Sequence, residues 1–115
     1  MKVVPTNLGF SVADGEGVDL SLIEGDLLLR FTDWRERPVE HCFREVLAFR
    51  WSARSTVETP RDDETYEVLE SPWLLEEVRC EGFQPEEFVH DVLCFNAAKV
   101  LEVISRRDAR RGPRS

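Results

Sequence analysis

The chain has 115 residues, of which 42% are hydrophobic and 33% charged, a composition typical of one folded domain and not of a disordered chain. No stretch approaches the roughly 18 consecutive apolar residues that a membrane helix needs, and the N-terminus lacks the apolar segment of a secretory signal. We therefore expect a cytoplasmic protein that does not enter a membrane.

The charge is spread unevenly along the chain, although the formal net charge is −8. Residues 106–115 contain five arginines and one acid, a net charge of +4, whereas residues 1–105 contain 10 basic and 22 acidic side chains, a net charge of −12. We expect residues 1–105 to form a single globular domain and residues 106–115 a disordered Arg-rich tail. The acidic domain disfavours specific binding of nucleic acid and favours a basic protein partner.

The first half of the chain alternates apolar and polar residues with the period of two that is typical of β-strands. The alternation predicts strands over 8–12, 18–22 and 27–32, with turns at 14–17 and 24–26. Charges and a proline over 33–38 predict an exposed hairpin loop. One strand with a β-bulge near 44–46 is predicted over 39–51, and a helix over 39–54 is the competing interpretation.

The second half of the chain is predicted to contain a helix and a β-hairpin. Ser71 and Pro72 are typical of a helix start. The remaining predictions are a loop over 52–64, a short edge strand over 66–70, a helix over 72–80, and a hairpin with strands over 89–95 and 100–104, for which a helix beginning at Pro85 is the alternative. The expected fold is mainly β, with α+β as the alternative: a single antiparallel sheet or a sandwich-like domain of about six or seven strands and one short helix.

The cysteines and histidines do not form a recognisable metal or catalytic motif. Cys42, Cys80 and Cys94 are an odd number without a signal peptide, which disfavours a disulfide framework. Their spacing to His41 and His90 does not match the close pairs of zinc sites. Both histidines fall in alternating strands, where a structural hydrogen-bonding role is expected. We expect no catalytic residue, no metal and no cofactor.

Acidic and tryptophan residues in loops are the candidate contacts for a partner. Tryptophan on a polar loop is a frequent anchor of protein interfaces, and it also packs as a lid over the end of a sheet. A dense acidic cluster attracts basic partners, and it is also the ordinary composition of a solvated loop. The candidate residues are Asp33 and Trp34 in the hairpin loop, Asp62, Asp63 and Glu64 in the long loop, and Trp73 at the helix start.

Several segments together resemble small bacterial β-sheet proteins, most of them uncharacterised and some of them similar to immunity proteins that neutralise toxins of neighbouring cells. The resemblance implies a β fold and a non-catalytic role, and it supplies no site residues. It spans residues 25–105 and is carried by 25–34, 62–64, 66–68, 71–74, 90–95 and 101–105.

The sequence therefore predicts a small, acidic, non-catalytic protein-binding module that is immunity-like. The first alternative is a structural β protein that forms a homodimer through an unpaired edge strand. The second is a small enzyme or metal-binding protein, which a polar cleft joining His41, His90 and a cysteine would reveal.

Overall fold

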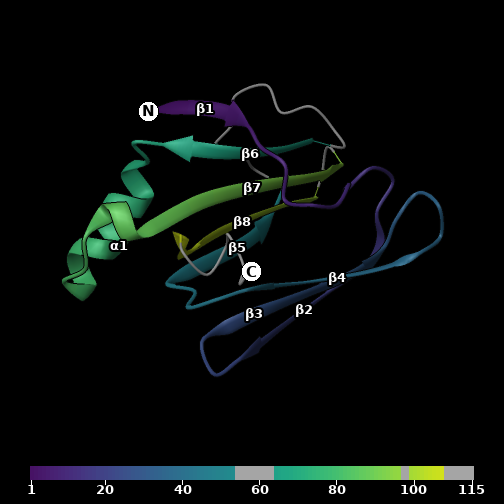
Figure 1. Cartoon of the computed structure of the whole chain (residues 1–115), viewed down its shortest axis with the longest axis horizontal. Helices are drawn as coiled ribbons and strands as arrows, with labels where there is room; N and C mark the ends of the chain where they lie inside the picture. Colours follow the sequence, from purple (N-terminus) through teal and green to yellow (C-terminus); the bar gives the residue numbers. More distant parts are fainter. Residues whose placement is uncertain (54–63, 97–98, 108–115) are drawn as a thin grey trace.

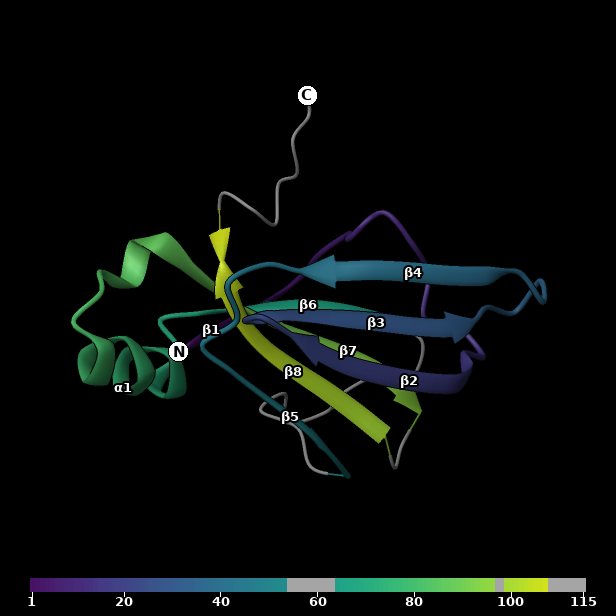
Figure 2. The same ribbon diagram turned by 90° about the horizontal axis from the view of Figure 1, so that it is seen from below.

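Two antiparallel sheets face each other in the computed structural model, which describes residues 1–53, 64–96 and 99–107 (Figures 1 and 2). The larger sheet has the order β1–β6–β7–β8–β5 and the smaller one the order β2–β3–β4. The strands are β1 (Lys2–Pro5), β2 (Glu16–Ile23), β3 (Asp26–Thr32), β4 (Pro38–Phe43), β5 (Ala48–Ser52), β6 (Glu64–Leu69), β7 (Phe88–Asn96) and β8 (Lys99–Arg106), and the helices are α1 (Pro72–Glu81) and a short 3-10 helix, η1 (Pro85–Glu87).

Apolar side chains between the two sheets form the main core. Leu29 and Phe31 alternate along β3 and pack against Leu93, Phe95 and Leu101 of the larger sheet, all of them at most 4% exposed. The rings of Phe31 and Phe95 meet edge to face, with their centroids 5.2 Å apart. Burial of this shared apolar surface holds the sheets together.

Helix α1 lies at one end of the sandwich, at the left of Figures 1 and 2. Ser71 caps it by accepting a hydrogen bond from the backbone N–H of Leu74, and Gly82 ends it with a φ of 76°, a left-handed conformation that glycine adopts without strain. Leu74 and Val78 pack against Phe88 and Ile104, so the helix is fixed on the ends of β7 and β8.

The mainly β fold, the helix after Ser71 and the C-terminal hairpin are confirmed. The helix predicted over 72–80 ends one residue later, at Glu81, and the predicted edge strand over 66–70 is β6. The predicted hairpin strands are β7 and β8, so the competing helix from Pro85 is wrong apart from the three residues of η1. Strand β6 is not at an edge, because β1 pairs with it from Lys2 opposite Leu69 onwards.

The strand predicted over 8–12 does not form. Two side chains bond to the local backbone instead: Asn7 Oδ1 accepts the N–H of Gly9 at 2.8 Å, and Ser11 Oγ accepts the N–H of Ala13 at 3.1 Å. Gly9 has a φ of 93°, which a strand does not permit. The apolar alternation in this segment marks burial, since Val12 is 1% exposed in the core.

The single strand predicted over 39–51 is two strands in different sheets, and the helix alternative is wrong. Strand β4 pairs with β3, whereas β5 pairs with β8. Between them Glu45 has a φ of 49°, and the N–H groups of Val46 and Leu47 bond to the carbonyls of Gly25 and Ile104. The expected bulge is therefore the point at which the chain crosses from one sheet to the other.

Part of the predicted loop and tail lies outside the described residues. These are residues 54–63 of the loop and 108–115 of the tail. Arg106 and Arg107, which the sequence assigned to the tail, contact the domain: the N–H of Arg106 donates to the carbonyl of Arg44, and Arg107 donates to Glu67 Oε2 at 3.2 Å. Among the described residues, no helix has the length and apolar character needed to span a membrane.

Candidate functional site

An acidic hollow lies beside the turn between β3 and β4. It has a volume of about 600 Å³ and is lined by Asp14, Glu16, Gly17, Thr32, Asp33, Trp34 and Glu36. All four charged lining residues are acidic, which favours cations, although one of them, Asp33, is already paired with Arg37. The β3–β4 turn and helix α1 lie at opposite ends of the molecule (Figures 1 and 2).

Asp33 organises the turn that forms one wall of the acidic hollow. Its Oδ1 accepts the backbone N–H groups of Arg35 and Arg37, both at 2.9 Å, and its Oδ2 lies 3.5 Å from the guanidinium of Arg37. The hydrogen bond from the Arg37 N–H is the main cause that lowers the pKa of Asp33 below its usual value, with smaller contributions from Arg35 and from the Arg37 charge, while partial burial opposes them. The carboxylate is thus held ionised at the rim of the hollow.

Trp34 presents its ring at the tip of the same turn. It is 53% exposed, and the guanidinium of Arg35 lies 4.6 Å from the ring centroid. This geometry is a cation–π contact, so the face of Trp34 already accepts a guanidinium. Aromatic and acidic groups in one hollow suit a lysine or arginine side chain.

The opposite wall of the hollow is set by a close glycine contact. A Cβ at Gly15 would lie 3.0 Å from Phe95 and 3.1 Å from Phe31, so a larger residue would fit only if these core rings moved by a few tenths of an ångström. Asp14 and Glu16 flank Gly15 and therefore reach the hollow. The sequence identified 14–17 only as a turn. The two acids on either side of Gly15 were the one feature of the sequence that could have indicated an acidic site there.

The other predicted contact residues do not join the acidic hollow. Trp73, on α1, is half-buried between the His90 ring, 5.2 Å away, and the Arg50 guanidinium, 4.2 Å away. Glu64 is exposed at the start of β6. Asp62 and Asp63 lie outside the described residues. Of the predicted residues that the structure describes, it thus brings together only Asp33 and Trp34.

A chain of buried polar groups lies beneath α1. Ser71 Oγ is 2.8 Å from His90 Nδ1, and His90 Nε2 is 2.6 Å from Glu102 Oε1, which also accepts a hydrogen bond from Arg50 at 3.2 Å. Ser71, His90 and Glu102 are at most 3% exposed. Because the carboxylate can only accept, Nε2 carries the proton in the neutral imidazole, and Nδ1 accepts the Ser71 hydroxyl proton. The sequence identified Ser71 only as a helix cap, and it did not single out Glu102.

The pairing of these groups follows from the strand register. Arg50 lies directly opposite Glu102 across β5 and β8, and His90 is opposite Ile104, two residues beyond Glu102 on the same face. This face therefore meets the start of α1. His41 lies in the other sheet, against the rings of Phe10 and Phe43, so the two histidines do not share a cleft.

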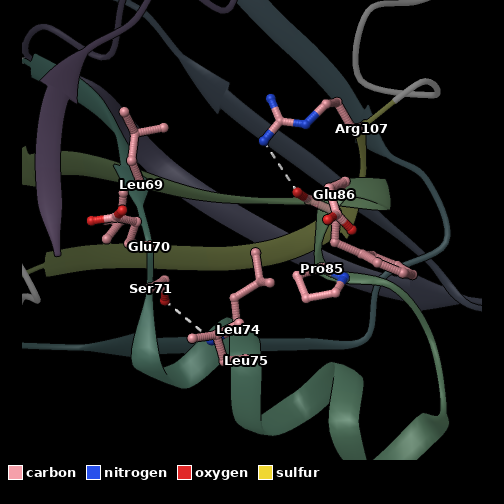
Figure 3. Close-up of a pocket in the computed structure, with 10 residues that line it drawn as sticks. Leu69, Glu70, Ser71, Leu74, Leu75, Pro85, Glu86 and Arg107 are labelled. Carbon is pink, nitrogen blue, oxygen red and sulfur yellow. Dashed lines mark hydrogen bonds between the residues drawn. The ribbon is translucent and has the colours of Figure 1, made fainter.

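A pocket of about 290 Å³ opens between α1, η1 and the end of β6, with Ser71 in its wall (Figure 3). Its walls are mainly apolar. Arg107 donates to the carbonyl of Phe88, and Ser71 accepts the N–H of Leu74, along its sides. The lining residues are Val68, Leu69, Glu70, Ser71, Leu74, Leu75, Pro85, Glu86, Phe88 and Arg107.

The remaining ligand-type side chains are scattered over the described part of the chain. In that part, no three His, Cys, Asp or Glu residues gather as a metal site would require. Cys42 and Cys80 are exposed free thiols, and Cys94 is a buried one. No protein-family model, curated protein or solved structure matches the chain.

Proposed function

We propose that the protein is a binding module whose acidic hollow receives a basic segment of another protein and carries out no chemistry on it. The observation that carries this proposal is the exposed ring of Trp34 in a hollow whose four charged residues are all acidic. The net charge of −12 over residues 1–105 accelerates encounter with a basic partner. The Trp34 ring, which the partner would bury on binding, supplies short-range affinity.

Neutralisation by occlusion is the mode of action that we propose for this module. A partner whose active surface is basic would be covered when its lysine or arginine side chain enters the hollow. The resemblance to immunity proteins, which carries no site residues, agrees with this mode. The partner's cation would replace Arg35 on the face of Trp34, so the bound state exchanges one cation–π contact for another.

A titration with a short synthetic peptide of alternating arginine and glycine tests the binding site. We expect the indole N–H signal of Trp34 in the NMR spectrum to shift, while the signals of Trp51 and Trp73 stay in place as internal references. Reversing two charges of the hollow, with Glu16→Lys and Glu36→Lys together, should weaken binding by about tenfold or more. The effect should shrink as salt rises, because salt screens exposed charges.

The matched control reverses two exposed charges elsewhere, with Glu76→Lys and Glu81→Lys on α1, so that the net charge changes equally. We expect the control protein to bind the peptide within about twofold of the wild type at the same ionic strength. If both double variants bind the peptide equally weakly, the peptide responds to the overall negative charge of the domain and not to the acidic hollow. An unmoved Trp34 signal would remove the site altogether.

A second candidate function is self-association through β2, and exposed apolar residues at a sheet edge favour it. Strand β2 is at the edge of the smaller sheet, and its last two residues, Leu22 and Ile23, are 58% and 56% exposed. An edge strand with apolar side chains and free backbone groups is a template for pairing with another strand. Strand β2 of a second copy of the chain can supply that other strand.

A further inference from the structure

The buried polar chain beneath α1 has the connectivity of a nucleophile, a base and a carboxylate. Ser71 Oγ contacts His90, and His90 contacts Glu102, at 2.8 Å and 2.6 Å. Ser71 also lines the apolar pocket of about 290 Å³. We propose that Ser71, His90 and Glu102 form a hydrolytic site for neutral carboxylic esters with short apolar acyl groups. This activity is independent of the acidic hollow, which lies at the other end of the molecule.

The hydrogen bonds of Ser71 leave its oxygen able to attack. A serine hydroxyl has one proton to donate and two lone pairs. The proton goes to His90 Nδ1, and one lone pair accepts the N–H of Leu74 at 3.1 Å. In the proposed site the second lone pair points toward a carbon atom seated in the pocket that Ser71 lines.

His90 is held as the base by Glu102. The carboxylate accepts Nε2–H, which fixes the imidazole in the tautomer whose basic nitrogen faces Ser71. In Ser-His-Asp triads the serine instead bonds to Nε2 and the acid to Nδ1. The exchange of nitrogens keeps the acid–base roles, because either ring nitrogen accepts a proton when the other one is protonated. Arg50 also donates to the same carboxylate oxygen, at 3.2 Å, and so adds a second hydrogen bond to Glu102.

The pocket selects the substrate class. Leu74, Leu75 and Phe88 present apolar walls, which suit a short hydrocarbon chain. Two exposed acids, Glu70 and Glu86, also line the pocket, whereas the lining Arg107 is paired with Glu67, so the lining as a whole disfavours anionic substrates. Ser71 lies at the N-terminal end of the ten-residue helix α1, whose dipole favours a negative oxygen beside it, although Pro72 has no N–H and the Leu74 N–H is donated to Ser71 Oγ.

The reaction runs in two balanced steps. In the first, Ser71 Oγ bonds to the acyl carbon while its proton moves to His90 Nδ1, and the departing alcohol takes that proton as its bond to carbon breaks. In the second, water attacks the acyl carbon and gives a proton to Nδ1. The bond to Ser71 Oγ then breaks, and the oxygen regains the proton as the carboxylic acid leaves.

The experiment combines an alkyl fluorophosphonate probe with hydrolysis of 4-nitrophenyl butyrate by the full chain. Intact-mass spectrometry should find one adduct per molecule, and peptide mapping should place it on Ser71. His90→Gln should slow both labelling and hydrolysis by about 100-fold or more, as loss of a general base does. Leu75→Trp, which fills the exposed side of the pocket, should slow both without touching the three polar residues.

The control is Ser105→Ala, since Ser105 is a buried serine on β8 outside the polar chain, and we expect wild-type rates from it. Glu102 acts through His90, so Glu102→Gln should lower kcat with KM unchanged, and Glu102→Asp should restore part of kcat at an unchanged melting temperature. An unlabelled wild-type protein overturns the proposal, and so does an adduct on another residue. Equal labelling of wild type and folded His90→Gln would leave the polar chain a purely structural feature.

Discussion

Two polar residues, Ser71 and Asp33, show how one side chain both shapes the backbone and equips a site. Ser71 caps α1 and donates to His90, so the start of the helix and the buried polar chain depend on one hydroxyl. Asp33 accepts hydrogen bonds from two backbone N–H groups of its turn, and the Trp34 side chain at the tip of that turn stays exposed. In both cases one side chain stabilises the local backbone and also contributes to a site formed by the tertiary structure.

Loss of His90 should be costly to stability. His90→Ala removes a donor to the buried carboxylate of Glu102 and leaves a cavity beside Trp73, so we expect the free energy of unfolding in urea to fall by about 3–5 kcal/mol. Ser105→Ala is the comparison, because Ser105 Oγ is buried with no hydrogen-bond partner in the described structure. That variant should stay within about 0.5 kcal/mol of wild type or gain stability. A fall below about 1 kcal/mol for His90→Ala would contradict the buried hydrogen bonds.

The lowered pKa of Asp33 predicts a stability difference that depends on pH. The folded state binds the Asp33 proton more weakly than the unfolded state, whose pKa is near 3.8, so the ionised carboxylate stabilises the fold above that pH. Relative to Asp33→Asn, the wild type should keep its full advantage at neutral pH. It should lose the advantage as pH falls below 3.8 through the lower folded pKa. Urea unfolding of both proteins over a pH series measures the difference, and a gap that stays constant into acid would refute the shift.

At the scale of elements, the turn over 14–17 and the β3–β4 turn converge on one hollow although they are separated along the chain. The turn before β2 rests on Phe31 and Phe95, and β2 pairs with β3 from Glu16 opposite Thr32 onwards. The strand pairing therefore places Asp14 and Glu16 beside Trp34. A hairpin with its preceding turn is the smallest unit that builds the acidic wall.

We expect a side chain at Gly15 to lower the free energy of unfolding, although both neighbouring residues in the sequence are acidic. Gly15→Ala gains a little stability by restricting the unfolded chain, but its Cβ meets two core rings at 3.0–3.1 Å. We expect a net loss of about 1–2 kcal/mol in the free energy of unfolding, because buried rings have little room to move. The shift of the Trp34 signal with the arginine–glycine peptide should also weaken. A stabilised variant would mean that the turn does not rest on the core.

At the scale of the whole molecule, the two candidate sites occupy opposite ends. The acidic hollow belongs to the smaller sheet, whereas the polar chain and its pocket lie where α1 meets the larger sheet. The main core between the sheets separates them. Variants at one end are therefore expected to leave the other end unchanged, since distant sites without shared contacts behave additively.

Strand β2 lies at an edge of the smaller sheet, so the oligomeric state depends on whether this edge pairs with a second copy of the chain. As a binding module the protein should be a monomer in native mass spectrometry at micromolar concentration, because β2 has a register shift between Glu16 and Asp19 and bulges of this kind discourage edge pairing. A stable dimer that Ile23→Lys converts to monomer would favour self-association instead. A dimer indifferent to that change would place the contact elsewhere.

The sequence by itself determined several of the strands and the start of the helix, but it did not mark β1. Period-two alternation predicted β3, β7 and β8, and Ser71 with Pro72 marked the start of α1, because these signals act between near neighbours. The same local argument failed over 8–12, where Asn7 and Ser11 bond to the backbone. It failed again over 39–51, where the slip in the alternation near 44–46 indicated a bulge within one strand and not a change of sheet.

Only the tertiary structure decided which residues meet. Register joined His90 of β7 to Glu102 of β8 and to a serine 19 residues upstream of His90, and packing joined Asp14 to Trp34 across two turns. A residue's neighbours across a sheet depend on strand order, which alternation does not encode. Thus Asp33 and Trp34 were predictable as exposed loop residues, whereas the hollow they share with Glu16 and the polar chain beneath α1 were not.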